Sequence, residues 1–284
     1  MNNVSELYQQ FHSTLLRLQT ILDSNGSVAG RGYEWLANLT DTFGNRIVGS
    51  DRLENAIDFL LDQLNADEFD NVHKEPVPDL PNWIRGEEEA TLLEPRLQNL
   101  AISATGGSIG GDVTAEAIVF RSFEELNAAG TQGLVQGKIV VFNQPWVNYG
   151  TSVAYRSGAS KAAKFGAVAT LIRSVTPFSI YSPHTGHAAD APIPSACLTV
   201  EDAEMLWRMQ QRGQKLKIHV RLTSRTNGTV TSHNTIFEIT GYKWPNEIVL
   251  LSGHLDSWDV GQGAMDDGGG CATMWTALKA IKAL

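Results

Sequence analysis

The side chains best suited to metal binding and acid–base chemistry are gathered in a short stretch near the end of the chain. This stretch holds one histidine and four aspartates, separated by glycines: His254, Asp256, Asp259, Asp266 and Asp267. An apolar run at residues 248–251 leads directly into it. Imidazole nitrogens and carboxylate oxygens are common ligands of zinc and of other divalent ions. The composition of the stretch therefore predicts a metal site.

The spacing of His254 and Asp256 suits a metal ligand and its supporting acid. One position separates the two residues, so in an extended segment their side chains point the same way. A carboxylate there can accept the second imidazole N–H of a metal-bound histidine, which fixes the tautomer and raises the basicity of the ligand. We therefore expect His254 to bind metal at the end of a buried strand, with Asp256 beside it.

Asp266 follows a loop rich in glycine and precedes a predicted helix. A carboxylate has two oxygens, so one aspartate can bridge two metal ions about 3.5–4 Å apart. The glycines at 268–270 allow a close approach of the backbone, and the helix dipole favours negative charge at the helix start. A two-metal hydrolase also needs about three ligands per metal and a carboxylate general base. No such groups are evident before residue 248, so we expect them beyond residue 284.

Other interpretations of the polar residues remain open. The histidine and aspartates described above can instead form a hydrogen-bonded loop at the end of a strand. Serine catalysis has little support, because the GxSxG pattern is absent and neither Ser252 nor Ser257 has an evident base partner. His184 and His187 could bind metal with Asp190, but a surface loop that at most borders the site is favoured.

Hydrophobic periodicity predicts the elements that must position these residues. Helices are expected at residues 4–23, 32–42, 51–65 and 271–284. The last helix has an apolar stripe of Met274, Leu278 and Ile281. Strands are expected at 69–77 and 90–103, separated by a stretch that Pro76, Pro78 and Pro81 interrupt. A hairpin of residues 233–241 and 247–253 leads into the metal-binding stretch.

A separate α/β module is expected between residues 104 and 224. Two glycine pairs at 104–112 mark its start, and no GxxxxGK[ST] or GxGxxG pattern accompanies them, which argues against a phosphate-binding loop. The predicted strands of the module are 113–119, 138–142, 167–172 and 216–222, and its predicted helices are 157–165 and 200–211.

The composition is that of a globular chain long enough for two domains. The chain has 284 residues, of which 42% are hydrophobic and 19% charged, with a net charge of −9. The acidic balance argues against nucleic acid or an anionic membrane as a partner, and no apolar stretch approaches the length of a membrane span. Cys197 and Cys271 form no CxxC motif, and we expect buried thiols. Asn-x-Ser/Thr sequons begin at Asn3, Asn25, Asn38 and Asn227.

Residues 253–270 strongly resemble the signature of the co-catalytic zinc aminopeptidase and glutamate carboxypeptidase superfamily. The run is Gly-His-Leu-Asp-Ser-Trp-Asp-Val-Gly-Gln-Gly-Ala-Met-Asp-Asp-Gly-Gly-Gly, and it is the most specific part of the resemblance. Supporting segments extend the resemblance along the whole chain; they are residues 43–50, 155–158, 183–186, 193–196 and 201–203.

For the fold, this resemblance implies an α/β chain with a phosphorylase/hydrolase-like zinc peptidase domain, incomplete here, and an inserted protease-associated α/β domain. Residues 1–103 would form the N-terminal part of the peptidase domain. Residues 104–224 would be the insert, and residues 225–284 would begin the metal-binding part of the peptidase domain.

For the site, the resemblance implies two Zn²⁺ ions. By motif position, His254 would be a terminal ligand of one zinc and Asp266 the ligand that bridges both. Asp256 would be the catalytic carboxylate that orients His254, and a cis peptide would join Asp266 to Asp267. The family's Glu-Glu pair, a further aspartate and a distal histidine ligand would all follow residue 284.

For function, the resemblance implies a zinc metallo-exopeptidase, a carboxypeptidase or dipeptidase that cleaves dipeptides or short peptides with free termini. Such proteins are homodimers and are secreted or lysosomal, which would suit a glycoprotein, although no signal-peptide core is present in this chain. Because the remaining ligands are missing, we expect a fragment that is inactive by itself. The alternative is a catalytically inactive short form that acts as a binding or interaction module.

Overall fold

The computed structural model describes residues 2–23, 25–188 and 190–284, and the chain divides into two compact units. The first unit combines the two ends of the chain, residues 1–81 and 229–284, and the second consists of residues 82–228. The second unit is therefore inserted between two segments of the first. Among the described residues, no helix is both long enough and apolar enough to cross a membrane.

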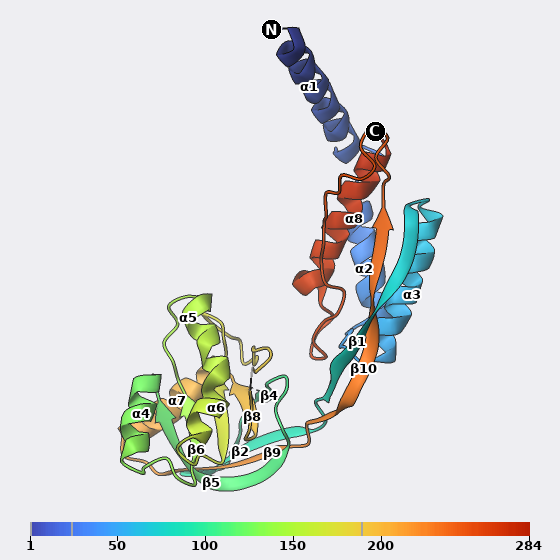
Figure 1. The fold of residues 1–284 in the computed structure, drawn as a ribbon. Coiled ribbons are helices and arrows are strands. Elements are labelled where there is room, and N and C mark those ends of the chain that lie inside the picture. Colours follow the sequence, from blue (N-terminus) through green and yellow to red (C-terminus); the bar gives the residue numbers. More distant parts are fainter. Residues whose placement is uncertain (1, 24, 189) are drawn as a thin grey trace. The chain divides into compact units, whose positions relative to one another are not determined.

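The first unit contains the four helices α1 (Asn2–Leu22), α2 (Arg31–Phe43), α3 (Asp51–Ala66) and α8 (Gly269–Lys282). All four match helices predicted from the hydrophobic periodicity. Ser50 caps α3 by accepting a hydrogen bond from the backbone N–H of Leu53. Helices α2 and α8 lie side by side (Figure 1), and Trp35 stacks on Trp275 with 6.0 Å between the ring centroids.

Of the predicted stripe of α8, Leu278 packs against the core of the first unit, but the most buried residues of the helix are others. Cys271, Ala272 and Trp275 are buried, whereas Ile281 is 45% exposed and Met274 is only half-buried. Both sets of residues recur at helical spacing, so the periodicity predicted the helix correctly. The side of α8 that faces the core is decided by its packing against α2, where Trp275 meets an aromatic partner.

Strands β1 (Asp70–Ile84) and β10 (Arg225–Glu238) form a two-stranded ribbon in Figure 1. Strand β1 continues through Pro76, Pro78 and Pro81, so the predicted interruption at these prolines is wrong. Proline lacks the N–H that a sheet ladder uses, but it is tolerated where a strand has a neighbour on one side only. In the described part of the chain β1 pairs with β10 alone, so one edge of β1 has no strand partner and can accommodate the prolines.

The predicted hairpin of residues 233–241 and 247–253 is not formed. Strand β10 ends at Glu238 and pairs with β1, and residues 247–253 are not in a strand. The apolar run is consequently exposed to solvent: Ile248 is 84%, Val249 91% and Leu250 81% exposed. Strand propensity alone does not make a strand, because the backbone needs a neighbouring ladder.

The second unit is built on an eight-stranded sheet in the order β3-β2-β9-β5-β6-β7-β8-β4. The strands are β2 (Glu88–Glu94), β3 (Gln98–Asn99), β4 (Ile102–Ala104), β5 (Gly111–Phe120), β6 (Ile139–Phe142), β7 (Ala169–Arg173), β8 (Ser195–Leu198) and β9 (Leu216–Leu222). Strands β5 to β8 are parallel, while β9 and β4 run antiparallel to their neighbours.

Helices cover both faces of the central strands. They are α4 (Phe123–Thr131), α5 (Tyr149–Val153), the 3-10 turn η1 (Ala154–Ser157), α6 (Gly158–Ala163) and α7 (Val200–Gln211). Val140 and Phe142 of β6 share a core cluster with Leu126 of α4 and Ala162 of α6. Ile139 and Val141 are equally buried and alternate with them, so they point to the opposite face.

The sheet of the second unit begins before the glycine pairs at 104–112. Strand β2 pairs with β9, with Ala90 opposite Val220, and β4 pairs with β8. These long-range pairs place residues 88–104 in the same sheet as residues 111–222. The compact unit thus extends from residue 82 to residue 228, and the domain limits at 103 and 224 stay predictions.

Candidate metal-binding site

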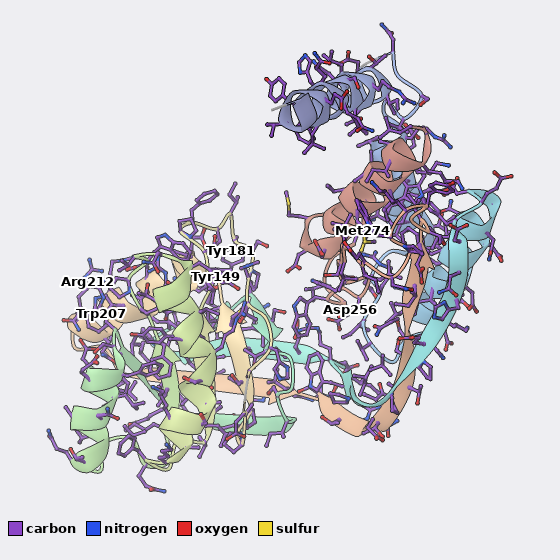
Figure 2. All side chains as sticks on the ribbon, turned by 45° about the horizontal axis from the view of Figure 1, so that its top comes forward. Tyr149, Tyr181, Trp207, Arg212, Asp256 and Met274 are labelled. Carbon is purple, nitrogen blue, oxygen red and sulfur yellow. The ribbon has the colours of Figure 1, made fainter. Side chains whose placement is uncertain are left out.

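The predicted site residues lie in a long loop of the first unit. The loop leaves β10, runs past Asp256 (Figure 2) and ends in a short π-helical turn, η2 (Ala264–Gly268), which leads into α8. Asp266 and Asp267 have non-helical backbone angles inside this turn. Their peptide bond is cis, as the resemblance implies. The loop therefore returns the two aspartates towards the residues that precede it.

His254 and Asp266 are brought together by this return. His254 Nε2 lies 2.9 Å from Asp266 Oδ1. On the other side of the ring, His254 Nδ1 lies 3.2 Å from Asp256 Oδ1 and 3.0 Å from the Asp256 carbonyl oxygen. The side chain of His254 is 52% exposed and that of Asp266 81%. The predicted trio is thus assembled, with Nε2 and the Asp266 carboxylate towards solvent.

Asp267 has a structural role that the sequence did not reveal. Its carboxylate accepts a hydrogen bond of 3.2 Å from the backbone N–H of His254. A Cβ at Gly270 would lie 2.3 Å from Asp267 Oδ1, so only glycine leaves room for the carboxylate there. Asp267 therefore ties His254 to the first turn of α8, where negative charge is favoured.

Arg46 was also not predicted as a site residue. It lies in the loop between α2 and α3 and is fully buried. Its guanidinium donates to the carbonyl oxygens of Leu255 and Gln262 at 2.8 and 2.7 Å. The only sequence signal for this residue is its place in the family-like segment 43–50.

The surrounding charges act on the ionisation of the site. Burial opposes the charged form of His254, but the Asp256 carbonyl and the carboxylates of Asp256 and Asp266 outweigh it and raise the pKa of the imidazole. Burial, reinforced by the Asp267 carboxylate, raises the pKa of the Cys271 thiol to about 11. The Cys271 thiol donates to the His254 carbonyl oxygen, which lies 3.4 Å from Sγ.

The donor set fits one side of a zinc site. The Nε2 nitrogen of His254 and a carboxylate oxygen of Asp266 converge, and the second imidazole nitrogen faces a carboxylate that can orient the ring. The described residues contain no group of three or more His, Cys, Asp or Glu side chains that could hold a metal ion. Since protein zinc sites usually have at least three protein ligands, His254 and Asp266 supply part of a site.

The two histidines of the second unit, His184 and His187, make no comparable arrangement with the described residues around them. His184 and His187 are exposed in the loop before β8. The backbone N–H of His184 donates to Ser174 Oγ, and the ring of His187 packs against Gly107. Within the part of the chain that the structure describes, neither histidine joins a metal-binding group. The favoured interpretation of this segment as a surface loop agrees with their exposure.

Comparison with known proteins bears directly on this site. Residues 234–284, which include the whole loop, match the model of Peptidase family M28. Carboxypeptidase Q of Xenopus laevis is 53% identical over 268 residues, which are 92% of this chain and 56% of that protein. Human carboxypeptidase Q is 52% identical over 267 residues, 91% of this chain. Over nine tenths of its own length, the chain is therefore similar to the carboxypeptidase Q proteins. The resemblance predicted from the motifs is therefore confirmed.

The solved structures that are similar to this chain agree with it in fold. The crystal structure of a peptidase M28 precursor from Shewanella amazonensis has a TM-score of 0.85, with 32% identity, and covers 96% of this chain and 63% of that one. A zinc aminopeptidase from Bacillus subtilis is 21% identical, with a TM-score of 0.63 over 89% of this chain and 57% of its own. The predicted α/β fold class is confirmed by these likenesses. The chain spans just over half the length of the carboxypeptidase Q relatives.

Proposed function

We propose that the chain is part of a zinc metallo-exopeptidase that hydrolyses dipeptides or short peptides with free termini through a two-zinc site. His254 and Asp266 are its metal ligands in this chain, and Asp256 is the catalytic carboxylate that orients His254. The observation that carries the proposal is the 2.9 Å approach of His254 Nε2 to Asp266 Oδ1. It occurs inside the segment that matches an established peptidase family.

The chain's own residues have distinct tasks in this function. Asp256 holds the proton of His254 Nδ1, which leaves Nε2 as the lone-pair donor. Asp266 offers two oxygens at an exposed position, which suits a bridging ligand. Bound zinc would supply a water of lowered pKa and would polarise the substrate carbonyl. The general base and the remaining ligands lie beyond residue 284 in this proposal.

A zinc titration of the chain tests the assignment. Calorimetry or competition with a chromophoric chelator would compare the unchanged chain with His254→Ala and Asp266→Ala. We expect weak binding in the unchanged chain and a loss of about tenfold or more in either variant, because each removes one of two ligands. His187→Ala is the matched control, since it removes an exposed histidine of the second unit. Equal affinity in all four proteins would contradict the assignment.

The family also supports proposals about the whole polypeptide. We propose that it forms a homodimer and is secreted or lysosomal, as a glycoprotein. Asn38 and Asn227 begin sequons and are exposed, so both are open to glycan attachment. Mass spectrometry of the protein from secreting cells, with and without a glycosidase, would test this. Unmodified asparagine at every sequon would contradict the glycoprotein proposal.

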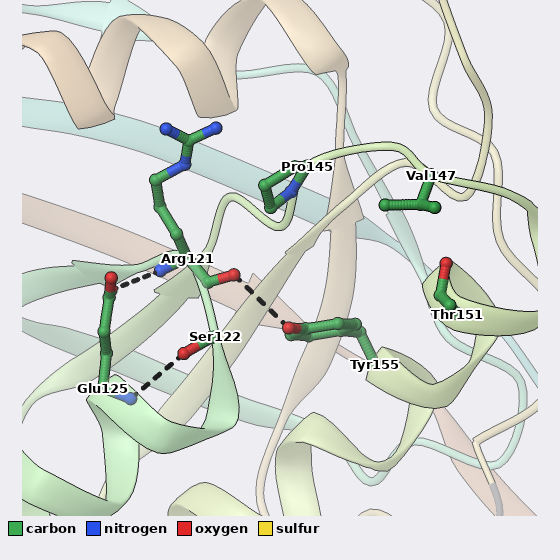
Figure 3. A pocket seen from close by; sticks show the side chains of 7 residues that line it. All are labelled: Arg121, Ser122, Glu125, Pro145, Val147, Thr151 and Tyr155. Atoms are coloured by element: carbon green, nitrogen blue, oxygen red, sulfur yellow. Dashed lines mark hydrogen bonds between the residues drawn. The ribbon is translucent and has the colours of Figure 1, made fainter.

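The second unit supports the alternative function of a binding module. A cavity of about 500 Å³ lies at the carboxyl ends of β5 and β6, where ligands of parallel sheets often bind (Figure 3). Its lining residues are Arg121, Ser122, Glu125, Pro145, Val147, Thr151 and Tyr155. The Tyr155 ring is held in place by stacking on Phe123 at 4.3 Å and by a hydrogen bond to the Arg121 carbonyl.

Short peptides are the occupant that this alternative favours. The cavity offers an aromatic ring, a proline and a valine, which suit an apolar side chain, whereas Arg121 and Glu125 contribute one charge of each sign. Val147 is 70% exposed, so Val147→Arg should block the cavity without disturbing the fold. A fluorescent apolar peptide that bound the unchanged chain and the variant equally would exclude this cavity as its site.

A further inference from the structure

The guanidinium of Arg46 contacts both ends of residues 254–263, the part of the long loop that is here called the metal-binding loop. Nε donates to the carbonyl oxygen of Leu255, the residue after His254, at 2.8 Å. Nη1 donates to Gln262 and Nη2 to Gly263, at 2.7 and 3.2 Å, just before the turn that carries Asp266. One rigid planar group therefore sets the distance between the two ends of the loop.

The backbone around Arg46 holds the middle of the same loop. The Arg46 N–H donates to Ser257 Oγ at 2.9 Å, and the Ser257 N–H donates to the Arg46 carbonyl oxygen at 3.0 Å. Asn45 Nδ2 also donates to the carbonyl oxygen of Asp259, at 3.2 Å. The loop is thus fixed at its start, middle and end by two consecutive residues that lie some two hundred positions earlier in the chain.

The loop packs tightly against the guanidinium at Gly263. Gly263 has a φ of +62°, and a Cβ there would lie 2.3 Å from Ser257 Cβ and 2.9 Å from Arg46 Nη2. Arg46 is itself fully buried, with a further hydrogen bond of 2.8 Å from Nη1 to the Gly44 carbonyl oxygen. A lysine has a single ammonium group on a flexible stem, so it cannot hold carbonyl oxygens on several sides at once.

We infer that Arg46 is a positioning residue, whose guanidinium holds the loop so that His254 and Asp266 meet. The effect of Arg46 on the affinity for zinc rests on the proposed function. The ordering of residues 254–263 by Arg46 rests on the hydrogen bonds alone. The two parts can therefore be measured separately.

Hydrogen–deuterium exchange of the metal-free chain tests the structural part. The proteins compared are the unchanged chain, Arg46→Lys and the matched control Arg173→Lys. Arg173 is also buried and donates to the Gln144 carbonyl oxygen, but it lies in the second unit. Arg46→Lys should speed exchange of the 254–263 amides by about tenfold, with α2 and α8 unchanged, because only the loop loses its support. Arg173→Lys should leave the loop as it is.

Zinc titration of the same proteins and of His254→Ala tests the functional part. Arg46→Lys should weaken Zn²⁺ binding by about 10- to 100-fold, the usual effect of losing a group that supports a ligand. Unchanged loop exchange in Arg46→Lys, or a rise spread equally over the whole first unit, overturns the positioning role. If the unchanged chain and His254→Ala bind zinc alike, the proposed function fails while the exchange result still decides the role of Arg46.

A milder variant keeps the inference testable if Arg46→Lys does not fold. Ser257→Ala removes the acceptor of the Arg46 N–H and leaves the guanidinium in place. It should speed exchange of the 255–259 amides by about threefold or more. No change there would show that the Arg46 backbone N–H does not hold the middle of the loop, and unchanged exchange of the 254–263 amides in Arg46→Gln, which lacks the guanidinium, would overturn the positioning role.

Discussion

At the scale of the residue, the site depends on which atom of His254 each neighbour contacts. Asp256 meets Nδ1 and Asp266 meets Nε2, so the ring is held between two carboxylates. In the spacing argument, Asp256 supports the His254 ring and Asp266 is a metal ligand. The positions of the two carboxylates at Nδ1 and Nε2 are compatible with these predicted roles. The backbone N–H of His254 is satisfied separately by Asp267.

Replacing Asp256 by asparagine should lower the pKa of His254 towards its ordinary value. The Asp256 carboxylate is one of the groups that raise this pKa, and the amide carries no charge. NMR titration of the imidazole in the metal-free chain would measure the shift. Asp190→Asn, in the second unit, is the control and should change nothing. An unaltered His254 titration in Asp256→Asn would contradict the role of the carboxylate.

At the scale of the element, the position of α8 decides where Asp266 and Asp267 lie. Two contacts tie α8 to the end of α3. Trp275 Nε1 and Lys279 Nζ donate to the two carboxylate oxygens of Asp67, at 2.9 and 2.7 Å. The side chains of Asp67 and Lys279 are each only 16% exposed, so this ion pair is largely shielded from water.

Replacing Asp67 by alanine should lower the free energy of unfolding by about 2 kcal/mol, because a largely shielded ammonium and an indole N–H lose their acceptor. Urea unfolding would measure the loss. Asp58→Ala is the matched control: its partner Lys74 is also 2.7 Å away, but the pair is exposed. That change should cost clearly less than the Asp67 replacement, because water screens an exposed pair. Equal losses in the two variants would mean that the Asp67 contacts add nothing beyond a surface pair.

A thiol buried in the sheet of the second unit should make the stability of the chain depend on pH in the alkaline range. Burial raises the pKa of the Cys197 thiol in β8 from 9.0 to about 12. The folded chain therefore keeps the thiol neutral where the unfolded chain ionises it. This stabilisation is complete below the unfolded value, and it is lost as the pH rises from that value through the folded one.

The free energy of unfolding should accordingly fall by about 1.4 kcal/mol between about pH 8 and pH 10 on account of Cys197 alone. Cys197→Ala removes the titrating group, so its stability should depend less steeply on pH. Urea unfolding of both proteins at the two pH values measures the difference. Parallel pH dependence in the two proteins would contradict the assignment to this thiol.

At the scale of the whole molecule, the chain combines an inserted α/β unit with a unit formed by its two end segments, of which residues 234–284 match a peptidase family. The first unit leaves a strand-like apolar run, residues 248–251, exposed next to the candidate site. The chain also spans just over half the length of its carboxypeptidase Q relatives. Both observations bear on whether these residues alone can complete a catalytic site.

The chain by itself should not hydrolyse dipeptides, even with added zinc. His254 and Asp266 are fewer ligands than a catalytic zinc needs, and no general base is assigned among the described residues. A dipeptide hydrolysis assay with and without zinc would measure this, with a zinc aminopeptidase as positive control. Turnover that a chelator abolishes would contradict the prediction.

The sequence by itself determined the long helices, most strands of the second unit and the cluster of His254, Asp256 and Asp266. Helical and strand periodicities are local, and metal-capable side chains close in sequence remain close in space. Long-range packing decided the rest. It paired β10 with β1 rather than with residues 247–253, and chose the buried face of α8. It also brought Arg46 to carbonyl oxygens some two hundred residues away, a contact that no local pattern encodes.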